Sequence, residues 1–256
     1  MRLATWNVNS LRVRLPHLLD WLAANSPDVA CLQETKCEDA TFPVDELKAA
    51  GYCSLHHGQR GYNGVAILAR GDADAVCRGI PEFTDEQSRV IAADVAGVRV
   101  VSVYVPNGQS VGSDKYQYKL RWFTALAAWL RAQLEVHPRV AVLGDFNVAP
   151  EDRDVHDPAA WAGQVLFSEP ERAALQGLFG LGLADAFRLF EQPDRSFTWW
   201  DYRMNAFRRK MGLRIDHVLL SPELARLCRA CSIDPGPRRL ERPSDHAPVL
   251  CELAWP

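Results

Sequence analysis

The chain has 256 residues, of which 48% are apolar and 24% charged, and its formal net charge at pH 7 is −3. This composition is ordinary for an α/β protein that buries a large core. No segment approaches the roughly 18–20 apolar residues needed to span a bilayer, and the first residues lack the apolar stretch of a signal peptide. We therefore expect one cytoplasmic domain over residues 1–256, with no membrane contact.

Short apolar runs that end in Asn, Asp, Glu or His recur along the chain and predict buried strands. They lack the alternation of a half-exposed strand, as is typical of strands covered on both faces. Two further strands are expected at 64–69 and 90–95, the second in a hairpin with 98–105. The runs with polar ends cover residues 3–9, 29–34, 100–107, 140–147, 215–220 and 244–251.

Helical spacing of apolar residues occurs between these strands. Residues 149–164 are polar and without pattern, which predicts a long loop, and loops of this length are usually functional or disordered. The expected helices are one at Leu15, Leu18, Leu19 and Leu22 with Pro16 in its first turn, one over 115–134, one from a Ser168–Glu171 capping box to Gly180 and Gly182, and one over 222–231.

The alternation of strands and helices, together with the hairpin, predicts mixed sheets rather than a purely parallel one. Two sheets packed together, with helices outside, would bring several strand ends to one edge. Polar residues that would be costly in the core would gather at that edge. No glycine-rich dinucleotide or Walker-type loop occurs, so nucleotide-cofactor folds lack support.

The residues at these strand ends are oxygen donors, and no cysteine shares their pattern. A set of carboxylates and amides selects a hard cation, Mg²⁺ or Mn²⁺, over zinc. Phosphate ester hydrolysis suits such a site, because the metal neutralises developing charge. Each residue also has a simpler interpretation as a turn, a strand end or a helix cap. The five donors, in chain order, are Asn7, Glu34, Asp145, Asn147 and Asp245.

A histidine and a tyrosine add acid–base groups. Asp216 lies in an apolar strand, where an unpaired carboxylate would be costly, and we expect it to pair with His246. His217 is the poorer partner, because adjacent strand residues point to opposite faces. Tyr104 is either a core aromatic or part of the site.

The cysteines and the basic residues are less informative. The seven cysteines show no framework spacing, and Cys228 and Cys231 are interpreted as structural. The net charge does not indicate a nucleic-acid partner. A basic segment runs from Arg203 to Arg214 and is either a solvated loop or a nucleic-acid contact; its cations are Arg203, Arg208, Arg209, Lys210 and Arg214.

Nine motifs in order closely resemble the exonuclease III family of DNA repair enzymes, within the endonuclease/exonuclease/phosphatase superfamily. The match runs from about residue 1 to 254 with compatible spacing. The motifs are TWNVNS (5–10), LQETK (32–36), NGVAIL (63–68), YVPNG (104–108), KYQYKLRW (115–122), GDFN (144–147), WWDYR (199–203), LRIDHVLLS (213–221) and SDHAPV (244–249).

The resemblance implies a four-layered α/β sandwich, with two packed mixed β-sheets flanked by helices, and a Mg²⁺ site in which Mn²⁺ can substitute. Asp145 would orient or deprotonate the attacking water and Asn147 would position phosphate or water. His246, buttressed by Asp216, would stabilise charge on the phosphoryl oxygens, and Tyr104 would contact the phosphate or help the leaving group. The implied metal-binding set is Asn7, Glu34, Asp145, Asn147, Asp245 and His246.

The resemblance also implies a DNA-binding surface. Trp199, Leu213 and Ile215 match the family's apolar pocket for a deoxyribose that has lost its base, and the alternative is that they belong to the core. The expected contacts to DNA further include Asn107, Lys119, Arg89 and the segment 203–214.

The expected activity is therefore Mg²⁺-dependent hydrolysis of double-stranded DNA at abasic sites, at blocked or recessed 3′ ends, or at both, by a monomer. One alternative is a relative that acts on an inositol phosphate, a sphingolipid or a poly(A) tail. The WWDYR motif and Ala247 after His246 favour DNA. Another is a non-catalytic binding module, which we would expect to lack at least one of Glu34, Asp145, Asn147 or His246.

Overall fold

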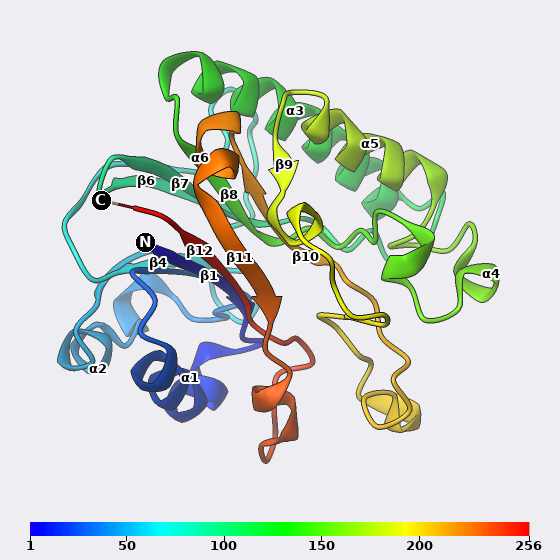
Figure 1. The fold of residues 1–256 in the computed structure, drawn as a ribbon, viewed down its shortest axis with the longest axis horizontal. Helices are drawn as coiled ribbons and strands as arrows, with labels where there is room; N and C mark the ends of the chain where they lie inside the picture. The colour runs from blue at the N-terminus through cyan, green and yellow to red at the C-terminus, as the bar shows by residue number, and fades with distance from the viewer. Residues whose placement is uncertain (256) are drawn as a thin grey trace.

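Two six-stranded β-sheets form the centre of the molecule, which the computed structural model describes for residues 1–255 (Figure 1). The first sheet has the strand order β11 (Cys228–Ile233), β12 (Val249–Leu253), β1 (Arg2–Asn7), β2 (Val29–Gln33), β4 (Val65–Ala69), β3 (Cys53–His57). The second has the order β5 (Ala73–Arg78), β6 (Val90–Val95), β7 (Val98–Tyr104), β8 (Val140–Asp145), β10 (Asp216–Leu220), β9 (Ala184–Asp185). Both sheets are mixed, as predicted, since β1–β2 and β7–β8 are parallel and the other neighbours antiparallel.

Helices cover the outer faces of the two sheets, which confirms the predicted α/β sandwich. In Figure 1, α1 (Leu11–Asn25) and α2 (Val44–Ala49) lie outside the first sheet, and α3 (Asp114–Val136) and α5 (Glu169–Phe179) lie outside the second. Two short helices, α4 (Pro158–Trp161) and α6 (Pro222–Leu227), complete the set, together with 3₁₀ turns at Asp39–Thr41, Asp152–Asp154, Ala186–Leu189, Arg203–Asn205 and Gly236–Arg239.

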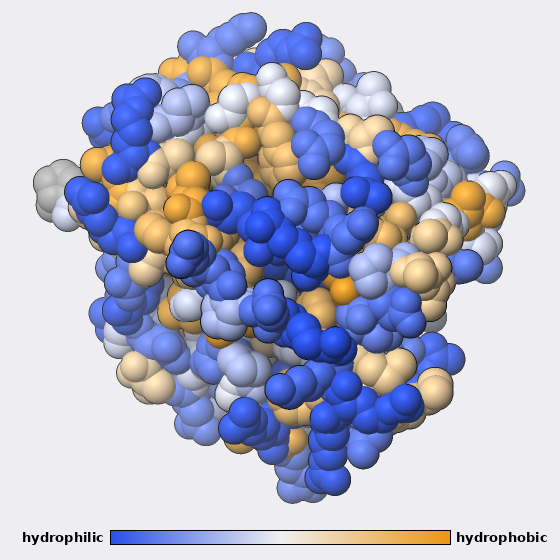
Figure 2. All heavy atoms as spheres, turned by 45° about the vertical axis from the view of Figure 1, so that its right-hand side comes forward, coloured by the Kyte–Doolittle hydropathy of each residue, from blue (hydrophilic) through white to orange (hydrophobic). Residues whose placement is uncertain are grey.

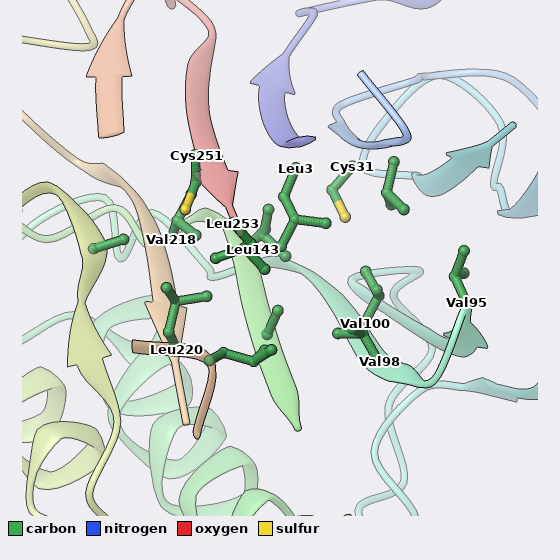
Figure 3. Packing of buried hydrophobic residues seen from close by; sticks show 14 of the residues in the cluster. Leu3, Cys31, Val95, Val98, Val100, Leu143, Val218, Leu220, Cys251 and Leu253 are labelled. Atoms are coloured by element: carbon green, nitrogen blue, oxygen red, sulfur yellow. The ribbon is translucent and has the colours of Figure 1, made fainter. Parts of the chain in front are cut away.

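The continuous apolar runs are explained by burial on both faces of each strand. In β1, Leu3 packs into the core between the sheets, whereas the next residue, Ala4, packs against α1. In β7, Val100 faces the core between the sheets and Val101 faces the layer of α3 and α5. Figure 3 shows Leu3, Val100 and other side chains from both sheets meeting between them.

Three sequence expectations about local structure are wrong. Pro16 is the sixth residue of α1, not part of its first turn. The helix expected over 222–231 ends at Leu227, and β11 follows directly because residues from Cys228 pair with β12. The loop 149–164 contains the short helix α4. Strands β3, β5 and β9 were not predicted; β5 is a largely exposed edge strand, so burial gives it no continuous apolar signal.

The strand register brings the polar strand ends to one edge of the two sheets. Asn7 is paired with Gln33, the residue before Glu34, across the parallel strands β1 and β2. Asp145 is paired with Tyr104 on one side and Asp216 on the other. This convergence follows from the arrangement expected of two packed sheets.

Within residues 1–255, the helices are all too short or too polar to cross a bilayer. The side of the molecule on which α4 lies is mostly hydrophilic, with smaller apolar areas between charged and polar residues (Figure 2).

Gly144, the residue before Asp145 in β8, provides a test of this packing. A Cβ added at Gly144 would lie 1.9 Å from the carbonyl oxygen of Val103 in β7. Gly144→Ala should therefore lower the free energy of unfolding by about 1–3 kcal/mol. The control is Gly177→Ala in α5, where a Cβ meets no atom within 4 Å and where alanine should stabilise the helix by up to about 1 kcal/mol. Equal stability of the two variants in urea titrations would contradict the clash.

Candidate active site

Two carboxylates and an imidazole meet at the common edge of the sheets. One ligand atom from each of Glu34, Asp145 and His246 lies within 4.8 Å of the other two. Glu34 follows β2 in a left-handed conformation, with φ 51°, and its side chain is 17% exposed. Asp145 ends β8 and is almost completely buried. Two close carboxylates without a cysteine are a donor set that suits a hard divalent cation.

Two asparagines hold these carboxylates in place. Asn7 Nδ2 donates hydrogen bonds to Glu34 Oε1 and Asp145 Oδ2, both at 2.9 Å. The backbone N–H of Asn147 donates to Asp145 Oδ1 at 2.9 Å, and its side chain Nδ2 donates to Asp145 Oδ2 at 3.2 Å. Both amides thus stabilise the charged form of Asp145. Their expected role as metal ligands stays a prediction.

The buried carboxylate of Asp145 has a raised pKa. Burial raises the pKa of Asp145 to about 7, opposed by the nearby imidazole of His246 and assisted by the carboxylate of Asp216. A carboxylate with such a pKa can exchange a proton near neutral pH.

The pairing expected between Asp216 and His246 is present. His246 Nδ1 lies 2.9 Å from Asp216 Oδ2, and Nε2 faces Asp145 Oδ2 at 3.7 Å. Burial by itself lowers the pKa of His246, but the carboxylates of Asp216 and Asp145 outweigh it and raise this pKa to about 10. The ring is therefore an imidazolium at neutral pH. An imidazolium can donate hydrogen bonds to anionic oxygens, which suits an electrostatic role for His246. Its expected role as a metal ligand stays a prediction.

His217 points to the opposite face of β10, as its alternation with Asp216 predicts. Its Nε2 lies 2.9 Å from the carbonyl oxygen of Val148, and its Nδ1 lies 3.0 Å from the guanidinium of Arg214. It does not reach the carboxylate cluster.

Tyr104 ends β7 beside Asp145 and lies under a cation. The guanidinium of Arg89 stacks over the Tyr104 ring at 4.6 Å from its centroid. Burial, and secondly the negative charge of Glu34, raise the pKa of Tyr104 well above its ordinary value. Its hydroxyl is therefore a neutral hydrogen-bond donor at the edge of the site. Tyr104 and Arg89 line a groove of about 730 Å³ that also includes Asn107 and Lys115.

Asp245 lies beside the carboxylate cluster but outside the group of three potential ligands. Its Oδ1 accepts a hydrogen bond from Asn9 Nδ2 at 2.8 Å, and its Oδ2 accepts one from Trp199 Nε1 at 3.0 Å. The carboxylate of Asp245 therefore orients the indole of Trp199.

The residues expected to form a pocket for a base-free sugar lie together. Trp199 is partly exposed, whereas Leu213 and Ile215 are fully buried beneath it. Leu166 and Phe167 fill the same cluster and are each 4% exposed. The predicted pocket residues are thus neighbours, and only Trp199 among the three offers surface to a ligand. The next residue, Trp200, is buried and points inward.

Two of the expected phosphate contacts are not consistent with the structure. Lys119 is fully buried and pairs with Glu171 at 2.5 Å. Arg214 is 1% exposed and pairs with Asp154 and Asp185. Both cations are held by carboxylates inside the protein, so neither can contact DNA. The basic residues that remain on the surface of the segment 203–214 are Arg203, Arg208, Arg209 and Lys210.

The structure adds two residues to which the sequence patterns assigned no role. Thr198 Oγ1 accepts hydrogen bonds from the backbone N–H groups of Ile215 and Asp216. Ser244 Oγ donates to the carbonyl oxygen of Asn7 at 2.7 Å and so ties the residues before His246 to β1. Hydroxyl residues of this kind carry no spacing signal, because their partners are distant in sequence.

Comparison with known proteins agrees with this geometry. The chain matches the Endonuclease/Exonuclease/phosphatase family over residues 4–246. It is 36% identical to Exodeoxyribonuclease III of Haemophilus influenzae, over 99% of this chain and 100% of that protein. It is 33% identical to the DNA repair nuclease APEX1 of Danio rerio, over 99% of this chain and 82% of that protein.

Solved structures show the same fold along the whole chain. A 3′ phosphatase from Neisseria, bound to a product DNA hairpin, has a TM-score of 0.98 and 45% identity, with 100% of both chains covered. An AP endonuclease from Archaeoglobus fulgidus has a TM-score of 0.97 and 38% identity, also with 100% of both chains covered. The chain therefore belongs to the exonuclease III family, within the Endonuclease/Exonuclease/phosphatase family, and is a hydrolase of phosphoric ester bonds.

Proposed function

We propose that this nuclease is a Mg²⁺-dependent DNA repair enzyme that removes blocking groups and nucleotides from 3′ ends and also incises DNA at abasic sites. The observation that carries the proposal is the cluster of Glu34 and Asp145 beside an imidazolium held by Asp216. The similarity to a 3′ phosphatase and to an AP endonuclease supports DNA as the substrate. Double-stranded DNA is thus the proposed partner, bound by a monomeric enzyme.

The protein residues have distinct tasks in this proposal. Bound Mg²⁺ would neutralise charge on the phosphoryl oxygens and orient the leaving oxygen. We assign Glu34, the more exposed carboxylate, to hold this cation. Asp145 lies next to Glu34. Asp145 accepts the proton of the attacking water, because its raised pKa keeps it basic enough at neutral pH.

The other residues stabilise charge on the phosphate. His246 directs its Nε2–H toward the phosphoryl oxygens, while Asp216 fixes the ring through Nδ1. Tyr104 and Asn107, which share a groove next to Asp145, donate hydrogen bonds to phosphate oxygens of the bound strand. The exposed cations Arg208, Arg209 and Lys210 contact the backbone of the DNA.

The apolar cluster around Trp199, which includes Leu166 and Phe167, affects whether the enzyme acts mainly at 3′ ends or at abasic sites. Leu166 and Phe167 pack on the side chains that would otherwise line the pocket for a flipped sugar. An abasic sugar must therefore displace side chains to enter, whereas a terminal 3′ phosphate need only reach the carboxylate cluster. This favours 3′-end processing as the main activity.

Three labelled duplexes test the proposed function: one with a 3′ phosphate, one with a recessed 3′ hydroxyl and one with an internal abasic analogue. With Mg²⁺ we expect the 3′ phosphate to be removed fastest, and we expect EDTA to abolish every activity until Mg²⁺ or Mn²⁺ is restored. Asp145→Asn, which should still bind the duplexes, controls for contaminating nuclease. Full activity in EDTA would refute the metal assignment.

The pH dependence of kcat/KM tests the roles of Asp145 and His246. Asp145 acts unprotonated, so activity should rise with pH through its pKa of about 7, and this limb should move to lower pH as bound cation favours the charged carboxylate. His246 acts protonated, so activity should fall as pH passes its pKa of about 10. Asp216→Asn removes the strongest interaction that raises this pKa and should move the alkaline limb to lower pH. An unmoved limb would exclude His246 as its origin.

Phe167→Ala tests whether the apolar cluster limits entry of an abasic sugar. Removing this ring opens space beside Trp199, so the ratio of abasic incision to 3′-phosphate removal should rise by about 10-fold, the size expected for relief of a steric barrier of this kind. Leu175→Ala, which truncates a buried residue between α3 and α5, controls for general destabilisation. The same ratio in both variants and in the wild type would show that the cluster does not control access.

A further inference from the structure

Lys119 is a lysine in the second turn of α3 that points into the protein, although a surface role was expected of it. Its side chain has no exposed area, and neither has that of its partner Glu171. The ammonium group is saturated by three acceptors: Glu171 Oε1 at 2.5 Å, the carbonyl oxygen of Asn147 at 2.7 Å and that of Asn107 at 3.1 Å. A buried cation with three acceptors in fixed directions holds those acceptors in one position relative to one another. We refer to Lys119 and Glu171 together as the clamp.

The two carbonyl acceptors belong to Asn147 and Asn107, which lie next to Asp145 and in the groove beside it. Asn147 follows β8 in a left-handed conformation, with φ 51°, and holds both oxygens of Asp145. Asn107 lies in the loop after β7, and its Nδ2 donates to Asn147 Oδ1 at 3.2 Å. Lys119 therefore fixes the backbone of two asparagines: Asn147, which bonds Asp145, and Asn107, whose side chain bonds that of Asn147.

The stem of Lys119 also supports the loop that carries Asn107. A Cβ added at Gly108 would lie 3.2 Å from Lys119 Cδ and 3.3 Å from a methyl group of Val165. The loop after β7 thus rests directly on the methylene chain. Removing the ammonium while keeping a chain of similar length should leave this contact and release the two carbonyl groups together with the carboxylate of Glu171.

Glu171 connects this clamp to the apolar cluster. The oxygen that pairs with Lys119 also accepts the backbone N–H of Leu166 at 3.0 Å. The other oxygen accepts the backbone N–H of Ser168 at 3.1 Å and its hydroxyl at 2.5 Å. One buried ion pair consequently holds the residues after β7, the residues after β8 and the segment that fills the pocket beside Trp199.

We propose that Lys119 is a positioning residue for the hydrolytic reaction: together with Glu171 it sets Asn147 and Asn107 in the geometry that Asp145 and the bound phosphate require. This inference rests on the proposed roles of Asp145 as the proton acceptor and of Asn107 at the phosphate. It concerns the chemical step, because the clamp acts on residues around Asp145, whereas the exposed cations proposed to contact the DNA backbone lie in the separate segment 203–214. Loss of the clamp should therefore reduce kcat more than it changes KM.

A charge-deletion series separates positioning from stability. Lys119→Met keeps the length of the chain but leaves the buried carboxylate of Glu171 without a counter-charge, so this variant should be destabilised. The double variant K119M/E171Q has no buried charge in the clamp and should recover part of the lost stability. The recovery is partial because the new amide NH2 must face a backbone N–H that Glu171 accepts. A purely structural role predicts that kcat recovers with Tm in the double variant, whereas positioning predicts that it does not, since neither side chain then donates to the carbonyl of Asn147.

Arg99→Met is the matched control. Arg99 is another buried cation, 6% exposed, with Asp94 and Gln133 as partners, and it lies near the start of β7, at the opposite end from Tyr104. This variant should lose stability while its kcat stays within about twofold of the wild type, because distant sites are independent.

The measurements are Tm, steady-state kinetics on a 3′-phosphate hairpin well below every Tm, and the side-chain amide signals of Asn107 and Asn147 in ¹⁵N spectra. For K119M and for the double variant we expect kcat to fall at least about tenfold, KM to change less than about threefold, and both amide signals to shift. Recovery of kcat in the double variant, or unshifted amide signals in K119M, would overturn the proposal. Inactivity of the wild type on this hairpin would instead contradict the proposed function, since the amide signals do not depend on catalysis.

Discussion

Asp145 is an almost completely buried carboxylate, and the arrangement of the site follows from the need to stabilise its charge. Its oxygens accept three hydrogen bonds, from Asn7 Nδ2, Asn147 N–H and Asn147 Nδ2, and His246 faces it at 3.7 Å. An unpaired buried carboxylate would cost several kcal/mol. The asparagines and the imidazolium reduce this cost but leave the pKa of Asp145 raised, which suits a group that must accept a proton.

The stabilising groups come from both sheets, so the site exists only when the sheets are packed together. Asn7 belongs to the first sheet and Asp145 to the second, and their hydrogen bond joins residues 138 positions apart. Ser244 and Trp6 tie the segment before β12 to β1, through the carbonyl oxygens of Asn7 and His246. Mispacking of the sheets would therefore affect stability and catalysis together.

Buried ion pairs form a second layer behind these residues. Lys119 with Glu171 supports the ends of β7 and β8, and Arg214 with Asp154 and Asp185 supports the approach to β10. Ion pairs of this kind contribute little net stability compared with apolar residues of the same size. Their directional hydrogen bonds can nevertheless fix a loop in one conformation, which apolar packing alone does less well.

The sequence by itself determined the strands that are buried on both faces, the long helices and the pairing of Asp216 with His246, because burial, helical period and strand alternation are local patterns. It also indicated the carboxylates of the site, since Glu34 and Asp145 directly follow or end such strands. Only the tertiary structure decided that Lys119 and Arg214 are buried in ion pairs and do not lie on the surface. A cation looks the same in sequence whether it meets solvent or a carboxylate from a distant segment, and Lys119 meets its partner 52 residues away.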